Sequence, residues 1–154
     1  MIIVSDTSPI TSLLSVGRIE ILRDLFSTVR IPAAVDAELR AYHADVPSFI
    51  EVAQVKDTAR VEHLEETLDR AEAEAIVLAH ELDADLLLID EKIGREIAER
   101  DGLHVIGLLG VLVLAKKKNL VPSVSACIDE LRQIAGFYVS DAVRDLIVRA
   151  AGED

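Results

Sequence analysis

The chain begins with the stretch Met1-Ile2-Ile3-Val4-Ser5-Asp6-Thr7-Ser8-Pro9, in which an apolar run ends in an acid. A continuous apolar run is typical of a parallel strand that is buried on both faces. We therefore expect residues 2–5 to form the first strand. We expect a helix to follow, with Ser8 as its N-cap and Pro9 at its first position, where proline's missing N–H costs nothing.

Short apolar runs and helical periodicity alternate along the rest of the chain. This alternation is typical of α/β proteins, in which helices pack on a mainly parallel sheet. Further strands are predicted at residues 28–31, 50–55, 85–89 and 103–106. Helices are predicted at residues 19–26, 32–40, 60–68, 69–82, 91–100, 108–118, 123–134 and 140–150, and the charged segment 60–68 is expected to be exposed. We expect one domain over residues 1–154, with the helices after about residue 122 appended to the sheet.

The composition limits the class of protein. Of the 154 residues 51% are hydrophobic, which is enough for one domain with a substantial core. Aromatic residues make up 3%, which disfavours binding by exposed stacking rings. The single cysteine, Cys127, excludes an internal disulfide and a multi-cysteine zinc site, and a reducing cytoplasm is the expected compartment.

No membrane segment is predicted. The N-terminus has no basic segment before its apolar run, unlike a signal peptide, and the longest apolar stretch, residues 103–115, is well short of the ~20 residues that span a bilayer. The formal net charge of −12 disfavours tight non-specific binding to nucleic acid. It does not exclude a nuclease whose metal ion supplies positive charge locally.

Two acids directly follow predicted strands, Asp6 after the first and Asp90 after Leu86-Leu87-Leu88-Ile89. Ligands of open parallel sheets bind beyond the carboxyl ends of the strands, so we expect both acids at that edge. Glu38 and Glu72 would reach the same place from flanking helices. Converging carboxylates repel one another unless a divalent cation lies between them, and the set therefore predicts a magnesium or manganese site.

Each acid also has a simpler interpretation. Asp6 fits a turn and Asp90 fits an N-cap, whereas Glu38 fits a solvated helix face. The segment Asp69-Arg70-Ala71-Glu72 fits a capping box, in which Glu72 only stabilises a helix start. A haloacid-dehalogenase-like phosphatase is disfavoured, because it needs a second Asp two residues after the first and Ser8 stands there.

Four segments of the chain resemble the PIN-domain family: Val4-Ser5-Asp6-Thr7-Ser8-Pro9-Ile10, Val35-Asp36-Ala37-Glu38-Leu39, Ala71-Glu72-Ala73-Glu74-Ala75-Ile76 and Leu87-Leu88-Ile89-Asp90-Glu91. More narrowly, they look like a prokaryotic branch of predicted PIN-domain nucleic-acid-binding proteins. The likeness runs from the first strand to about residue 120, and the C-terminal helices are similar to that branch as well. One departure is Ile93, in the region where many PIN domains have a further acid.

The resemblance implies a three-layer α/β/α sandwich with a central, mainly parallel sheet and a metal-dependent endoribonuclease site. It implies Mg²⁺ or Mn²⁺ as cofactor and RNA as substrate. Many relatives are toxins of type II toxin-antitoxin pairs that act as homodimers and are neutralised by a small antitoxin. The matching positions for the metal-holding catalytic acids are Asp6, Glu38, Glu72 and Asp90, with possible support from Thr7, Ser8, Glu74 and Glu91. The alternative is a weakly active or inactive PIN-like module that acts through protein or RNA contacts.

Overall fold

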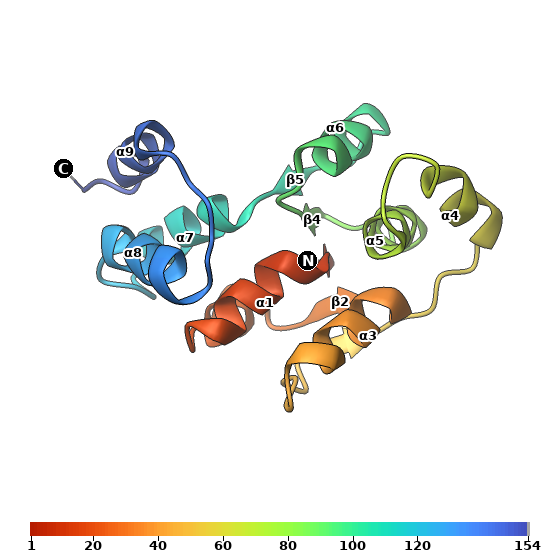
Figure 1. Ribbon diagram of the computed structural model, residues 1–154, viewed down its shortest axis with the longest axis horizontal. Coiled ribbons are helices and arrows are strands. Elements are labelled where there is room, and N and C mark those ends of the chain that lie inside the picture. Colours follow the sequence, from red (N-terminus) through yellow and green to blue (C-terminus); the bar gives the residue numbers. More distant parts are fainter. Residues whose placement is uncertain (154) are drawn as a thin grey trace.

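Five parallel strands form the centre of the molecule in a computed structural model, which describes residues 1–153 (Figure 1). The strands are short, and the three central ones, β1, β2 and β4, are largely buried. Their bounds are β1 (Ile3–Ser5), β2 (Val29–Ile31), β3 (Ile50–Val52), β4 (Leu86–Leu88) and β5 (Val105–Ile106). Their order is β3-β2-β1-β4-β5, and every neighbouring pair is parallel. Helices cover both faces of the sheet, so the predicted three-layer α/β/α sandwich is confirmed.

The strand order changes direction at the centre of the sheet. From β1 the chain moves outward through β2 to β3, then returns to place β4 on the other side of β1. The register pairs Ser5 with Leu88, and the backbone N–H of Asp6 donates to the carbonyl of Leu88 at 2.9 Å. Ligands of open α/β sheets bind at such a reversal, beyond the carboxyl ends of the strands. Asp6 and Asp90 both follow strands that end there.

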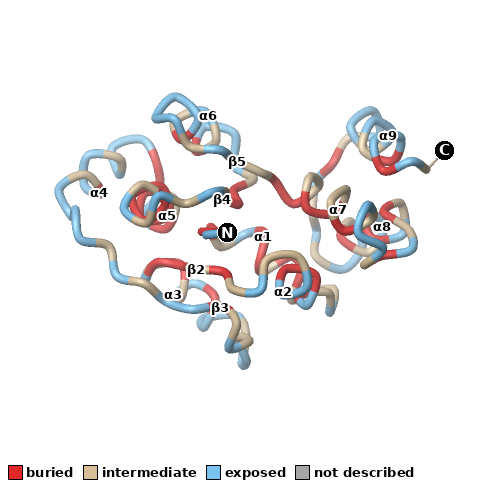
Figure 2. Tube along the Cα trace, turned by 180° about the vertical axis from the view of Figure 1, so that it is seen from behind, coloured by how far each residue is buried: buried red, intermediate tan, exposed pale blue. Residues whose placement is uncertain are grey.

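The strands divide the apolar side chains between two cores, because successive residues of a strand point to opposite faces. The helices are α1 (Thr7–Ser15), α2 (Glu20–Phe26), α3 (Ala33–Tyr42), α4 (Thr58–Leu64), α5 (Arg70–Glu81), α6 (Lys92–Arg100), α7 (Leu108–Lys117), α8 (Val124–Ile134) and α9 (Asp141–Ala150). Ile3 and Leu88 belong to a core that includes residues of α1, α7 and α8. Val4 and Leu87 belong to a second core formed with α5 and α6. Figure 2 shows buried residues on the central strands and on α5.

Two helix starts differ from the prediction. Helix α1 begins at Thr7 with Asp6 as its N-cap residue, so the prediction of Ser8 as N-cap is wrong. The backbone of Asp6 is extended (φ −78°, ψ 176°), which lets the helix follow the strand without an intervening turn. Helix α4 begins at Thr58 and buries Val61 beside Val77 of α5, so it is not the fully exposed helix that its charges suggested.

Helices α8 and α9 lie outside the sheet and pack against α7, at the end of the molecule opposite α4 (Figure 1). Both begin as predicted at serine N-caps, because the hydroxyls of Ser123 and Ser140 accept backbone N–H groups of the first turn. Ile128 of α8 and Val148 of α9 belong to the same core as Ile3 of β1. Within residues 1–153, no helix has the length and apolar character needed to cross a bilayer.

Candidate active site

A cavity of about 460 Å³ opens at the carboxyl ends of β1 and β4. It is lined by the end of β1, the first turns of α1 and α5, one face of α3 and the loop after β4. All four predicted acids line it: the full set is Asp6, Thr7, Ser8, Thr11, Glu38, Tyr42, Asp69, Glu72, Asp90 and Glu91. Residues separated by more than 80 positions in the sequence therefore share one small volume.

Asp6 lines this cavity and is 6% exposed. Burial raises the pKa of its carboxyl group to about 7. The backbone N–H of Thr7 opposes this change, whereas the negative charges of Asp69, Glu38 and Asp90 add to it. A carboxyl group that is hard to ionise beside other acids is one that a cation would stabilise.

Asp90 uses one carboxylate oxygen for structure and leaves the other free. Its Oδ1 accepts the backbone N–H of Leu108 at 2.8 Å, at the start of α7. Its Oδ2 is buried and has no hydrogen-bond partner. Burial raises the pKa of Asp90, although the Leu108 N–H and the charge of Arg95 act in the opposite direction. Buried polar atoms are nearly always hydrogen-bonded, so the unpaired Oδ2 is available to bind a ligand.

Glu72 repeats this pattern on the first turn of α5. Asp69 caps the helix by accepting the backbone N–H of Glu72 at 2.8 Å, which is one half of the predicted capping box. The Glu72 side chain does not complete the box, because its Oε2 is buried and unpaired. Burial raises the pKa of Glu72, with further increases from a hydrogen bond to Asp69 and from nearby negative charges.

Glu38 is the exposed member of the four acids. It lies on α3, and its Oε2 accepts a hydrogen bond from the Thr7 hydroxyl at 2.5 Å. This bond connects α3 to the first residue of α1 across 31 positions of sequence. Thr7 therefore turns the Glu38 carboxylate toward the end of β1.

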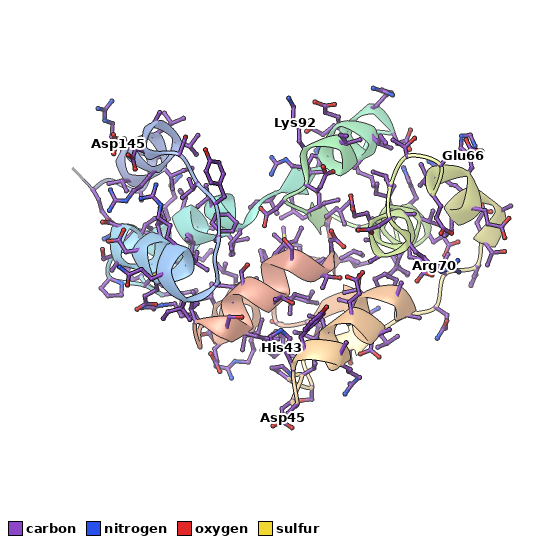
Figure 3. All side chains as sticks on the ribbon, viewed as in Figure 1. His43, Asp45, Glu66, Arg70, Lys92 and Asp145 are labelled. Carbon is purple, nitrogen blue, oxygen red and sulfur yellow. The ribbon has the colours of Figure 1, made fainter. Side chains whose placement is uncertain are left out.

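The structure separates Glu72 from its predicted substitute Glu74. The Glu74 carboxylate accepts the backbone N–H of Ala34 at 3.0 Å and pairs with Arg70 at 2.9 Å, so it holds the start of α3 against α5. Arg70, labelled in Figure 3, also reaches Glu65. Glu74 does not line the cavity, and both of its oxygens are occupied.

The other supporting residues also have defined places. Glu91 is the N-cap of α6, because its Oε2 accepts the Gly94 N–H at 2.8 Å. Ser8 lines the cavity from an exposed position on α1. Sequence reasoning treated Asp69 only as a cap and missed it as a cavity acid. Its position three residues before Glu72 was the available signal, since a cap residue lies beside its helix's first turn.

The acids fit a hard divalent cation. Mg²⁺ and Mn²⁺ prefer carboxylate oxygens, and this cavity offers two buried, unpaired ones, Glu72 Oε2 and Asp90 Oδ2. Burial, with smaller contributions from neighbouring acids, raises the pKa of Asp6, so a bound cation would favour its ionised form. Over residues 1–153, however, no three Asp, Glu, His or Cys side chains already surround a common point. The donor set is present, whereas a closed coordination shell is not.

A family model described as a PIN domain matches residues 2–153. The chain belongs to the PIN-domain family. A search of curated proteins found no match. PIN domains have a nuclease-type fold, act on nucleic acids and typically use divalent metal ions. The parallel sheet and the acids at its carboxyl edge are the features expected of such a fold.

Proposed function

We propose that this PIN domain is a divalent-metal-dependent endoribonuclease, with Asp6, Glu38, Glu72 and Asp90 as its metal-holding catalytic acids and Mg²⁺ or Mn²⁺ as its cofactor. One observation supports this most directly. Two carboxylate oxygens from different elements, α5 and the loop after β4, are buried without partners in the same cavity. A purely structural role does not account for the unpaired buried oxygen on each of these two acids.

The four acids would divide the work according to their surroundings. Asp6 and Asp90 would be the central ligands, because they follow β1 and β4 at the carboxyl edge of the sheet. Asp6 is buried and its N–H donates to Leu88, and Asp90 is held by the Leu108 N–H. Glu72 would complete the set from a capped helix start, and Glu38 would be oriented by the Thr7 hydroxyl.

When bound, a divalent cation lowers the pKa of an attacking water and stabilises charge on the phosphate oxygens. The protein would contribute a rigid set of oxygens at the strand ends and a cavity open to a phosphate backbone. No side chain would act as a nucleophile. Neutralisation of the acids by the cation would also reduce their repulsion of the substrate.

We further propose that the protein is the toxin of a type II toxin-antitoxin pair, acting in the cytoplasm as a homodimer and neutralised by a small antitoxin. The resemblance to PIN-domain toxins supports this part of the proposal. Two exposed apolar side chains on one face of α9, Val143 and Leu146, offer a surface for a protein partner.

The alternative is a PIN-like module that binds without cleaving. The net charge of −12 and the absence, among residues 1–153, of a preformed cluster of three metal ligands favour it. The two proposals differ in one result: a binding module shows no metal-dependent cleavage under any condition.

The deciding experiment measures cleavage of mixed single-stranded RNA substrates with Mg²⁺, Mn²⁺ or EDTA. Asp6→Asn should abolish both cleavage and Mn²⁺ binding by calorimetry. The matched control is Asp83→Asn, which removes one exposed charge where φ is +51°, a conformation that asparagine tolerates. Equal activity of the Asp6→Asn and unaltered proteins would refute the proposal.

A further inference from the structure

A second cavity, of about 530 Å³, lies next to the first, and Asp90 lines both. It runs between α6, the β5–α7 loop and the segment that joins α8 to α9. Its lining includes Arg95, Gly107, Phe137, Tyr138 and Ile147. Of the four candidate acids, Asp90 therefore lies between two cavities of similar size.

Each hollow is lined by one of the two tyrosines of the chain. Tyr42 lines the acid cavity and is 82% exposed, whereas Tyr138 lines the second cavity and is 88% exposed. The three phenylalanines are partly buried against the apolar core. The two tyrosines are thus the exposed aromatic rings of the chain, and each lines one of the two cavities that Asp90 lines.

Tyr42 is tied to the acids by helix geometry. It stands four residues after Glu38 on α3, so the two side chains share a face. The Nε2 atom of the next residue, His43, lies 3.3 Å from the Thr11 hydroxyl of α1. This contact holds the end of α3, where His43 is labelled in Figure 3, beside α1. The ring therefore stands at the rim of the acid cavity on a supported helix end.

Positive charge cannot supply most of the affinity for nucleic acid here. Of the described residues that line the two cavities, Arg95 alone is a lysine or an arginine. Its guanidinium lies 3.3 Å from the Ile89 carbonyl and beside Asp90. A substrate strand would gain little from counterion release, so another source of binding free energy is needed.

We propose that Tyr42 and Tyr138 are stacking platforms for unpaired bases of the substrate strand, one in each of the two cavities that Asp90 lines. This inference rests on the proposed ribonuclease function. An aromatic ring can stack on a base of any identity, but only if that base is not already paired. Arg95 contacts a phosphate in the second cavity. Aromatic residues are scarce, which argued against stacking, but the two exposed rings lie in the two cavities that share Asp90.

Tyrosine fluorescence can be measured for these two rings directly, because the chain has two tyrosines and no tryptophan. Tyr138→Phe leaves Tyr42 as the emitter, and Tyr42→Phe leaves Tyr138. A short oligoadenylate, added to the full chain in EDTA so that metal-dependent cleavage is absent, should quench each remaining emission. An oligomer of the same length without bases should quench neither.

The affinity for oligoadenylate should depend on the aromatic ring of each tyrosine and not on its hydroxyl group. Tyr42→Ala and Tyr138→Ala should each weaken oligoadenylate binding roughly 5- to 100-fold, and the phenylalanine variants should bind as the unaltered chain does. The slope of log affinity against log salt should be close to that of a single phosphate contact, about −0.7. Double-stranded RNA should bind weakly in every variant.

The control is Ile134→Ala on α8, which removes a 63% exposed apolar side chain that lines neither cavity. It should leave oligoadenylate binding unchanged. An equal loss in this variant, or the absence of quenching from both tyrosines, would overturn the inference. It would also be overturned if Tyr138→Ala changed the mass of the protein in solution and left RNA binding intact, because Tyr138 would then belong to a protein interface.

Different results would refute the ribonuclease function and the stacking role of the tyrosines. If oligoadenylate quenches both tyrosines but no RNA is cleaved with Mg²⁺ or Mn²⁺, the ribonuclease proposal fails and the stacking platforms stand. If RNA is cleaved and both alanine variants cleave and bind normally, the platforms fail and the ribonuclease stands.

Discussion

Gly94 of α6 lies directly against the carboxylate of Glu72: a Cβ on Gly94 would come within 3.2 Å of Glu72 Oε2 and 2.8 Å of Ile89 Cδ1. The glycine is in a helix and is not needed for its backbone conformation. It leaves the space into which the unpaired Glu72 oxygen projects. The first turn of α6 thus sets the position of a candidate ligand on α5.

Gly94→Ala should therefore affect the site more than the fold. Alanine raises helix propensity by about 1 kcal/mol, which offsets much of the cost of moving the Ile89 side chain. We expect a change of about 1 kcal/mol or less in the free energy of unfolding by urea. Mn²⁺ affinity should fall about tenfold in calorimetry, because the displaced Glu72 carboxylate no longer meets the cavity in the same position.

The matched control for this variant is Gly110→Ala in α7. Its Cβ would meet an isoleucine in the same way, Ile106 Cγ1 at 2.8 Å, but no carboxylate lies nearby. Mn²⁺ affinity should be unchanged in that variant. If both alanine variants lose the same affinity, packing and not the position of Glu72 is responsible.

Asp6→Asn should stabilise the metal-free protein at alkaline pH. Burial, reinforced by neighbouring acids, raises the folded-state pKa of Asp6 to about 7, against about 3.9 in an unfolded chain. Between these values the folded state holds a proton that the unfolded state releases. The favourable contribution is complete below about pH 4 and is lost as pH rises through 7.

Urea unfolding in EDTA at pH 5 and pH 8 tests this sign. The unaltered protein should lose more stability between the two values than the asparagine variant. At pH 8 the variant should be more stable by on the order of 1–4 kcal/mol. Parallel pH profiles for the two proteins would show that Asp6 ionises normally in the folded state.

Substitutions of the two acids in the Ala71-Glu72-Ala73-Glu74 segment should have different effects, one on stability and the other on metal binding. Glu74→Ala removes the partner of the Ala34 N–H and of Arg70, and should lower the free energy of unfolding by about 2–3 kcal/mol. Glu72→Gln should change the free energy of unfolding by no more than about 1 kcal/mol at pH 5, where the raised pKa keeps Glu72 protonated in the folded state, and should abolish tight Mn²⁺ binding. Thermal unfolding and calorimetry on both variants compare them, and a Glu74→Ala protein that is stable but inactive would reverse the assignment.

Thr7 should act on the site through Glu38. Thr7→Val removes the hydroxyl that donates to Glu38 Oε2 and preserves the volume of the side chain. We expect Mn²⁺ affinity to fall about 10-fold to 100-fold, the usual range for a residue that orients a metal ligand. Thr7→Ser, which keeps the donor, should restore affinity, and no recovery would mean that Thr7 matters only for packing.

Asp90 should show its two roles separately. Asp90→Asn keeps an oxygen acceptor for the Leu108 N–H and should unfold like the unaltered protein while losing Mn²⁺ binding. Asp90→Ala also loses the contact at the start of α7, and should unfold with about 1–2 kcal/mol less free energy. Equal stability of the two variants would show that the Leu108 contact adds nothing.

The sequence by itself determined the strands, most of the helices and the acids that follow β1 and β4. These features depend on local sequence patterns. A buried parallel strand has a continuous apolar sequence, and the residue that follows it lies at the carboxyl edge of the sheet. The predicted start of α1 was two residues too late. Ser8-Pro9 matches the pattern of a helix start, whereas the helix begins directly after Asp6.

Only the tertiary structure decided which acids meet. Glu72 and Glu74 stand two positions apart with the same local signal, and the packing of α5 against α3 turns one to the cavity and the other to Ala34. The contact between Thr7 and Glu38, and the two exposed tyrosines beside the acids, likewise depend on how helices are rotated against the sheet. That rotation is set by the burial of apolar side chains far apart in the chain, which no local pattern encodes.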